Sequence, residues 1–542
     1  MAVAALSSGC AAGGGAGPGG RVRPSGLRED RVLVGSLDDI TQVAVSQRMV
    51  FATTRDALAT LDRQFGTWLP PLTVADGYPA GPATAIAADP VDDAVWVGTL
   101  GAVTFYRPLL DYHLSTIVPG QVQQIVFDRR DPGAGAYVLS SGTWTLISRT
   151  GNAMMADPAR LPPPAFRIVT PRLEDLFREY PSLRSFQSLL TRDEQLQSWP
   201  LSAGSKQPDR SSEIWLGTRG NGLYKADPVF NKSEHFPYGL LAPGAAALAP
   251  AADGIWVAGL GGGRAQRSGL TFASEDLQRW RWLQGTLSRP LQGARTYALD
   301  VRGRIAWLAT DRGAVRMDTQ NDNDVRVWTL GNGLPDDRAL AVAATARGAW
   351  IGTGRGVVFI SDSGSGRGAA RGAVSSTIVA GTPVRALLAT GDTLWVGTES
   401  GLLLLAPGDT LPRRPAAAAS DPRFRRPVVA LARSDSEVVV ALQDDIVRLA
   451  LPDGRVLPRF EAVNIASLRG ITAVDMDQST IWAVGYGGVL VIARASGVSR
   501  FLAAPGEIPA EAYDVLLRGD YGWVATRAGL LRLRRVTGGS VR

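Results

Sequence analysis

The feature that most constrains the fold is a short tryptophan segment that recurs along most of the chain. Four copies read Trp-X-Gly-Thr with an aliphatic residue at X, and four looser copies keep the tryptophan and its apolar neighbours. Weaker copies begin at Val50, Tyr137 and Val439. Successive copies are 41 to 51 residues apart, except for one interval of 78 residues that marks an insertion. Eight of the 14 tryptophans share this register: Trp96, Trp215, Trp256, Trp307, Trp350, Trp395, Trp482 and Trp523.

Each repeat has the composition of four short antiparallel strands. An apolar run such as 384–389 comes before the tryptophan segment, a glycine-containing turn follows it, and two further apolar segments end the repeat. Such runs, separated by Gly, Asp and Asn, are typical of strands joined by hairpins. The pattern predicts an all-β chain, a β-propeller of about eleven four-stranded blades. We expect each indole to fill the wedge between neighbouring blades, and the glycine two residues later to let a neighbouring group approach closely.

The spacing also predicts how the blades are grouped. Seven regular units run from Trp256 to Trp523, so we expect a seven-bladed C-terminal propeller over residues 241–542. The first four units would form a smaller propeller over residues 29–240, packed against the other. The last unit lacks a fourth strand, whereas residues 31–35 form an orphan strand, which is predicted to complete the last blade and remove an exposed edge. A single ring of all the blades stays open as the alternative.

Residues 155–209 interrupt the repeat and predict a small helical insertion. Thr170 followed by Pro171 is typical of a helix start. Two short amphipathic helices are expected to follow. They could cover a propeller face or dock a partner, or they could plug a gap between the two propellers, which is the interpretation we favour slightly. The apolar positions are Leu173, Leu176, Phe177 and Tyr180 in the first helix and Leu183, Phe186, Leu189 and Leu190 in the second.

The single cysteine, Cys10, gives information on where the protein is located in the cell. It follows a short apolar run with small residues and precedes a Gly/Pro-rich stretch, which is similar to a bacterial lipoprotein signal, so residues 1–28 are interpreted as a signal remnant and tether. Several acyl chains at Cys10 would give lasting membrane attachment. The run is short and no Lys or Arg precedes it, so a chance cysteine in a disordered terminus stays open. One cysteine excludes internal disulfides and cysteine-ligated zinc.

Charge and residue chemistry argue against several activities. The net charge of +7, from 57 basic and 50 acidic residues, comes almost entirely from scattered arginines, so we expect no nucleic-acid partner. The two histidines, His113 and His235, are expected at the surface or in turns. The polar run 318–324 could hold calcium, but an Asx-rich turn is the favoured interpretation. We predict no metal site, no cofactor and no catalytic residues.

Three short sequence motifs suggest a family resemblance. Gly-Leu-Pro at 333–335 and Gly-Tyr-Pro at 77–79 each come before an apolar run and a Trp-X-Gly-Thr segment, and a fainter version stands at 238–241. The chain thereby resembles the two-component regulator propeller repeat family. The resemblance implies paired propellers of the kind found in the periplasmic part of hybrid sensor histidine kinases, where they sense ligands such as glycans. No kinase follows the repeats here, so a stand-alone propeller is expected.

These observations predict a non-catalytic binding or sensing protein of the bacterial cell envelope. Its partner would be an unidentified ligand, for which the resemblance suggests a glycan, or an envelope protein, and it would meet the membrane only through a lipid anchor. The alternatives are a propeller-type lyase or glycoside hydrolase, and a scaffold that uses residues 155–209. Paired carboxylates at a propeller mouth would favour a hydrolase. A mouth with aromatics and arginines would favour binding.

Overall fold

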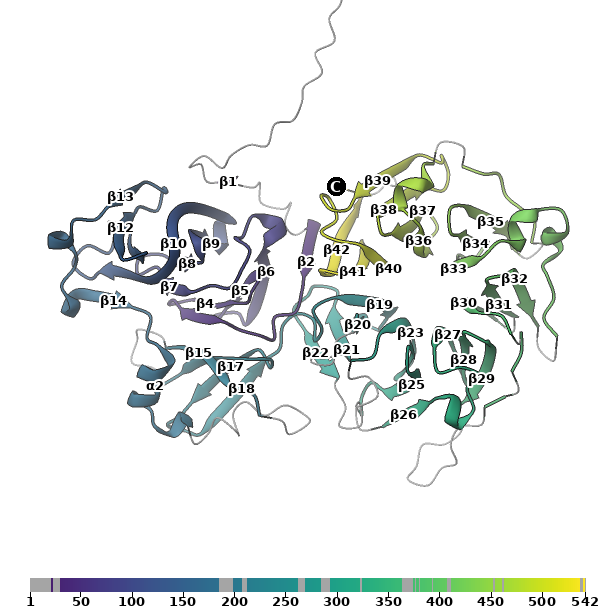
Figure 1. Ribbon diagram of the computed structural model, residues 1–542, viewed down its shortest axis with the longest axis horizontal. Helices are drawn as coiled ribbons and strands as arrows, with labels where there is room; N and C mark the ends of the chain where they lie inside the picture. Colours follow the sequence, from purple (N-terminus) through teal and green to yellow (C-terminus); the bar gives the residue numbers. More distant parts are fainter. Residues whose placement is uncertain are drawn as a thin grey trace, which may run out of the picture.

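The described chain is mainly β-structure arranged in two lobes that lie side by side (Figure 1). The N-terminal lobe runs from β3 to β18 and the C-terminal lobe from β19 to β42. Both are built from small antiparallel sheets set around a centre, which confirms the predicted all-β, propeller-like repeat fold. The computed structural model describes residues 21–541 apart from 23–29, 185–197, 207–211, 262–268, 284–292, 322–323, 363–373, 376, 380, 392, 407–410, 452–453, 461–462 and 537–539.

The N-terminal lobe holds four sets of strands within the described residues. The second and third sets share the long strand β10 and so belong to one sheet, which β1 (Arg21–Val22) also joins. The first strands of the sets are neighbours, because β3 contacts both β7 and β15, and β7 contacts β10. The sets are β3 (Gln42–Val45), β4 (Met49–Thr53), β5 (Ala57–Asp62) and β6 (Thr67–Thr73); β7 (Ala85–Ala88), β8 (Val95–Gly98), β9 (Leu100–Arg107) and β10 (Tyr112–Asp128); β10 with β11 (Ala136–Ser140), β12 (Thr143–Ile147) and β13 (Ala153–Met155); and β15 (Leu201–Lys206), β16 (Ile214–Thr218), β17 (Leu223–Asp227) and β18 (Lys232–Phe236).

The C-terminal lobe holds seven further sheets in the described part of the chain. Their first strands contact one another in chain order, and the last of them, β40, also contacts the first, β19. The sheets are β19 (Ala245–Pro250), β20 (Gly254–Gly259), β21 (Leu270–Ser274) and β22 (Trp280–Leu283); β23 (Thr296–Arg302), β24 (Ile305–Thr310), β25 (Gly313–Asp318) and β26 (Val325–Trp328); β27 (Ala339–Thr345), β28 (Gly348–Thr353) and β29 (Gly356–Ser361); β30 (Val384–Thr390), β31 (Thr393–Thr398) and β32 (Gly401–Leu405); β33 (Val428–Arg433), β34 (Glu437–Leu442) and β35 (Ile446–Ala450); β36 (Ile471–Met476), β37 (Thr480–Gly485), β38 (Gly488–Ala493) and β39 (Ser499–Ala503); and β40 (Ala512–Arg518), β41 (Tyr521–Thr526) and β42 (Gly529–Val536) with β2 (Arg31–Val34) and β43 (Ser540–Val541).

Three sheets of the C-terminal lobe differ from the predicted four strands. Those that begin with β27, β30 and β33 show three strands each in the described residues. Beyond their third strands the pairing continues only as isolated bridges, such as Leu404 with Arg413 and Leu449 with Val456. Between strands the chain forms short 3-10 helices: η1 (Val74–Asp76), η2 (Pro108–Leu110), η3 (Pro158–Arg160), η4 (Pro164–Phe166), η5 (Leu330–Asn332), η6 (Ala416–Ala419), η7 (Pro422–Arg425) and η8 (Ile465–Leu468).

The repeated tryptophans lie between neighbouring sheets. Trp96 of β8 packs against Phe127 of the next set, with ring centroids 6.4 Å apart. Trp523 of the last sheet shares a buried cluster with Leu248 of β19. Seven of the eight repeated tryptophans are buried and Trp350 is half-buried. A large flat ring at each junction buries apolar area from both sheets, which is what holds successive sheets together.

The glycine of the Trp-X-Gly-Thr segment lets the next sheet approach closely. A Cβ atom on Gly98 would lie 2.4 Å from Cγ1 of Val122, and one on Gly352 would lie 2.7 Å from Cγ1 of Val384. Val122 and Val384 both belong to the first strand of the following set. A side chain at the glycine position would therefore push neighbouring sheets apart.

The N-terminal strand β2 lies in the C-terminal lobe (Figure 1). It pairs antiparallel with β42, with Arg31 opposite Leu533 and Val34 opposite Leu530. The 31–35 segment therefore lies beside the last sheet, as predicted. Through this pairing, a segment from the other end of the chain covers the hydrogen-bonding edge of β42.

Candidate functional site

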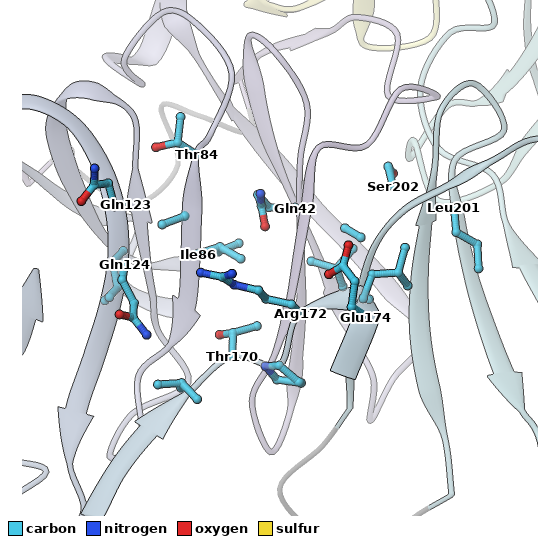
Figure 2. A pocket seen from close by; sticks show the side chains of 18 of the residues that line it. Gln42, Thr84, Ile86, Gln123, Gln124, Thr170, Arg172, Glu174, Leu201 and Ser202 are labelled. Carbon is cyan, nitrogen blue, oxygen red and sulfur yellow. The ribbon is translucent and has the colours of Figure 1, made fainter. Parts of the chain in front are cut away.

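The main candidate site is a cavity at the centre of the N-terminal lobe. Its volume is about 490 Å³, which is in the usual range for small-molecule sites. Four first strands, β3, β7, β10 and β15, contribute lining residues. The segment that joins β14 (Arg167–Val169) to α2 (Leu173–Glu179) contributes a further wall (Figure 2), and Arg219, which follows β16, completes the lining.

Polar side chains dominate the lining. Figure 2 shows three glutamine side chains around the guanidinium of Arg172, with Glu174 nearby. Among the lining residues that the structure describes, Glu174 is the single carboxylate and none is aromatic. Each glutamine amide offers two donors and a carbonyl acceptor. The polar lining residues are Gln42, Thr84, Gln123, Gln124, Thr170, Arg172, Glu174, Ser202 and Arg219.

Some lining groups are already engaged by the protein. The Thr84 hydroxyl donates to the carbonyl of Val122 at 2.6 Å, and the Ser202 hydroxyl donates to the carbonyl of Ile40 at 2.5 Å. Both bonds tie one first strand to the chain of a neighbouring set. Arg219 pairs with Asp39 at 3.3 Å. These contacts fix the walls and leave the other polar groups for the cavity.

Two lining residues, Gln123 and Ser202, sit at irregularities of their strands. The pairing of β10 with β11 shifts between Val122 and Gln124, and that of β15 with β16 shifts between Leu201 and Ala203. A β-bulge leaves one residue unpaired and redirects its side chain. The repeat pattern places these strands correctly but carries no signal for the bulges, so the sequence analysis missed both residues.

The insertion fills a gap inside the N-terminal lobe. β14 pairs antiparallel with β10, and α2 contacts β15, so the segment spans the space between these two first strands. A Cβ atom on Gly204 of β15 would lie 2.6 Å from Cδ1 of Leu176, so any larger residue would force the buried Leu176 side chain, or α2 with it, to shift. Our preferred interpretation, a plug between two propellers, is wrong for the described part of the insertion, because both neighbours of the segment belong to one lobe.

The helix boundaries of the insertion also differ from the prediction. α2 begins at Leu173 and Arg172 precedes it, so Thr170 does not cap the helix. Thr170 and Pro171 instead line the cavity. Of the second expected helix, Leu183 is buried, and Phe186, Leu189 and Leu190 lie outside the described residues.

A second cluster lies where the first strands of the C-terminal lobe begin. The guanidinium of Arg295 lies over the ring of Tyr297 at 5.4 Å, and Tyr486 meets Tyr513 edge-on with centroids 6.4 Å apart. Burial raises the pKa of Tyr513, and the Glu511 carboxylate raises it further. Tyr297 and Tyr513 both occupy bulge positions. Aromatics with an arginine are the composition that we expected of a binding surface.

Three aspartates link first strands across the C-terminal lobe. Asp300 accepts a hydrogen bond from the backbone N–H of Ala344 at 2.7 Å, and Asp475 accepts one from Leu517 at 2.7 Å. Asp514 accepts one from the N–H of Leu248 at 2.8 Å. Burial raises the pKa of Asp475 to about 6 and that of Asp514 to about 7, and it raises that of Asp300. Each carboxyl group thus acts as a brace between sheets. Sequence analysis missed them, although an aspartate inside an apolar strand was a usable signal.

The remaining predicted residues have structural surroundings. Asp318, at the start of the polar run, pairs with Arg304 at 3.0 Å, and residues 322–323 of that run lie outside the described residues. The described residues hold no cluster of three or more metal-binding side chains. The prediction for the histidines is wrong: His113 is buried in β10, and His235 lies in β18, where Nε2 contacts the Asn221 carbonyl at 2.9 Å. Cys10 and the 1–20 stretch lie outside the described residues. None of the helices in the described part of the chain has the length and hydrophobicity needed to cross a bilayer.

Comparisons with known proteins add distant structural likenesses. No family model and no curated protein sequence matches the chain. The extracellular domain assigned to a hybrid two component system of B. thetaiotaomicron is 13% identical, covers 92% of this chain and 71% of its own, and gives a TM-score of 0.42. A virginiamycin B lyase from Staphylococcus aureus is 14% identical over 54% of this chain and 96% of its own, with a TM-score of 0.41. Both TM-scores are low, so neither likeness assigns an activity to this chain.

Proposed function

We propose that this protein is a non-catalytic binding protein that takes a small polar ligand into the central cavity of its N-terminal lobe. In this proposal the chain forms two propellers over residues 29–240 and 241–542, with four and seven blades, and β2 completes the last blade. The contacts between successive first strands, and between β40 and β19, support this grouping.

The observation that carries the proposal is the chemistry of the cavity. Within the described residues, the side chains of Arg172, Glu174 and the three lining glutamines make no hydrogen bond or ion pair with the protein. Hydrogen-bonding groups that converge on a concave space without partners are free to recognise a ligand. A hydrolase of the two-carboxylate type would need a second acid near Glu174, and the described lining residues offer none. The cavity therefore favours binding over glycoside hydrolysis.

A thermal-denaturation screen tests the proposal. Purified protein is mixed with small hydrophilic compounds, namely neutral sugars, sugar acids, amino acids and dipeptides, and a ligand is recognised by a raised unfolding temperature. Gln42→Trp should abolish the shift, because an indole would fill part of the cavity. Gln64→Trp is the control, since Gln64 is exposed in the turn between β5 and β6. A shift that survives Gln42→Trp would place binding elsewhere, and the Tyr297–Tyr513 cluster would be the next surface to test.

For location we propose a lipid anchor at Cys10 that holds the propellers at the bacterial cell envelope. The small residues before Cys10 and the Gly/Pro-rich stretch after it support this proposal. Cys10→Ser should move the full chain from the membrane fraction to the soluble fraction. Retention of the Cys10→Ser protein in membranes would count against lipidation.

A further inference from the structure

We propose that the ligand of the N-terminal cavity is a small hydrophilic carboxylate and that Arg172 binds its carboxylate group. The inference rests on the proposed function, because it names the chemistry of the ligand at that site. It also gives the insertion a role, since Arg172 comes from the segment that joins β14 to α2.

The charge of Arg172 stands without a partner in the described part of the chain. Arg172 projects into the cavity. Two other arginines of the lobe are paired, Arg149 with Asp89 at 2.8 Å and Arg219 with Asp39 at 3.3 Å, whereas Arg55 and Arg129 are exposed at the surface. A guanidinium presents a fixed fork of donors that matches the two oxygens of a carboxylate. An anion from solution is therefore the natural partner of Arg172.

The backbone holds Arg172 in place before any ligand arrives. Upstream, β14 pairs with β10 through Val169 and Val126. Downstream, Leu176 is fully buried against β15. Between them, the ring of Pro171 fixes its own φ and restricts Thr170. A segment fixed at both ends loses little backbone entropy when a ligand binds, which favours affinity.

The neighbours of Arg172 define the rest of the ligand. Gln42, Gln123 and Gln124 offer amide donors and acceptors, which suit hydroxyl or amide groups. Glu174 repels a second anionic group and accepts hydrogen bonds from hydroxyls or an ammonium group. The described lining residues include no aromatic side chain, and so offer no stacking surface for a flat apolar ring. A hydroxy acid such as a hexuronate and an α-amino acid both fit this description.

Matched pairs of compounds test the inference. Each pair differs in its carboxylate: galacturonate with galactose, gluconate with sorbitol, glutamine with its amide, and an acetylated dipeptide acid with its amide. Binding to the full chain is measured by calorimetry and by thermal shift. We expect acids to bind more tightly than their neutral partners. The sugar acids and the amino acids then separate the two sources of the carboxylate.

Two variants make the test specific to Arg172. Arg172→Gln should weaken binding of the acid by roughly 10- to 100-fold and change binding of its neutral partner little. Arg178→Gln removes the same charge from α2, which follows Arg172, at a side chain that is 79% exposed and pairs with Asp175, so it should bind like the wild type. Neutral partners that bind as tightly as the acids, or an Arg172→Gln protein that keeps full affinity for the acid, would overturn the inference and leave the proposed function standing. If no member of any pair binds, the proposed function fails as well.

Discussion

The rings of Trp68 and Tyr238 stack face to face, with centroids 4.2 Å apart and an interplanar angle of 10°. Trp68 belongs to β6 of the N-terminal lobe, and Tyr238 belongs to the link between β18 and β19. On its other side Tyr238 meets Trp280 of the C-terminal lobe edge-on at 5.5 Å. The side chain of Gln278 also accepts from the N–H of Trp68 at 2.8 Å and donates to its carbonyl at 3.0 Å. The link between the lobes is therefore held between two indoles.

Loss of the Tyr238 ring should destabilise the protein strongly. We expect Tyr238→Ala to lower the free energy of unfolding by about 3–5 kcal/mol, because a buried aromatic ring and two ring contacts are lost. Tyr238→Phe keeps the ring and loses the hydrogen bond from the hydroxyl to the Leu69 carbonyl at 3.2 Å, so it should cost about 0.5–1.5 kcal/mol. Urea denaturation followed by tryptophan fluorescence measures both. Equal losses for the two variants would contradict a role for the ring.

A buried ion pair beneath Trp96 supports a second prediction. Asp89 is fully buried and accepts hydrogen bonds from Nε1 of Trp96 at 2.9 Å and from the Arg149 guanidinium at 2.8 Å. Arg149→Met would leave a buried carboxylate without its cation, so it should lower the free energy of unfolding by about 3–5 kcal/mol.

The matched variant for that pair is Arg107→Met. Arg107 pairs with Asp92 at 2.5 Å, but both side chains are about one-third exposed. Water and salt screen such a pair, so the loss should be about 0–1 kcal/mol. The two variants are compared by their midpoints of urea denaturation. A loss at Arg149 as small as that at Arg107 would show that the Asp89 carboxylate does not depend on its cation.

The sequence predicted those parts of the fold that follow from the spacing of its repeat. Trp96 and Trp523 mark the same place in two repeats 427 residues apart in numbering, and both pack against the following sheet. The orphan strand β2 could be assigned because β42 lacked a partner within its own repeat. These inferences work because strand alternation and turn residues are local signals, and the same signals recur in successive repeats.

The cavity could not be predicted in the same way. Its walls come from six separate segments of the sequence, and Gln42 and Gln123 have no local pattern that brings them together. The bulges at Gln123 and Ser202 turn residues inward against the strand alternation. The place of the insertion depends on Gly204, which by sequence alone is one glycine among 62. Packing between distant segments decided each of these features.

Gly204 itself gives a third prediction. Its Cβ would lie 2.6 Å from Leu176, so Gly204→Ala should displace α2 and cost about 1–3 kcal/mol of stability. The displacement should also weaken ligand binding, because α2 follows directly after Arg172. Gly331→Ala is the control, since the nearest atom to its Cβ would be 3.7 Å away. Gly204→Ala with unchanged stability and unchanged affinity would mean that α2 does not need this close contact.

Asp475 and Asp514 predict how stability depends on pH. Burial raises the pKa of Asp475 from 3.8 to about 6 and that of Asp514 from 3.8 to about 7. Below about pH 4 both groups are protonated in the folded and the unfolded chain, so they do not make the free energy of unfolding depend on pH. The unfolded chain has lost these protons while the folded chain keeps them between about pH 4 and 6 for Asp475 and between about pH 4 and 7 for Asp514. Folding then binds protons, so the free energy of unfolding should fall as the pH rises, by up to about 1.4 kcal/mol per pH unit for each group.

Asp514→Asn tests this sign directly. The amide oxygen can still accept the hydrogen bond from Leu248, whereas the titration is gone. The variant should therefore show a shallower fall in the free energy of unfolding between about pH 5 and 7. At pH 8 it should have gained stability relative to the wild type. Asp520→Asn, at an exposed turn, is the control and should leave the slope unchanged. Urea denaturation at pH 5, 6, 7 and 8 gives the four values for each protein. If the Asp514→Asn slope equals that of the wild type, the Asp514 carboxyl group is already ionised in the folded protein at pH 5, and its contact with β19 is that of a charged brace.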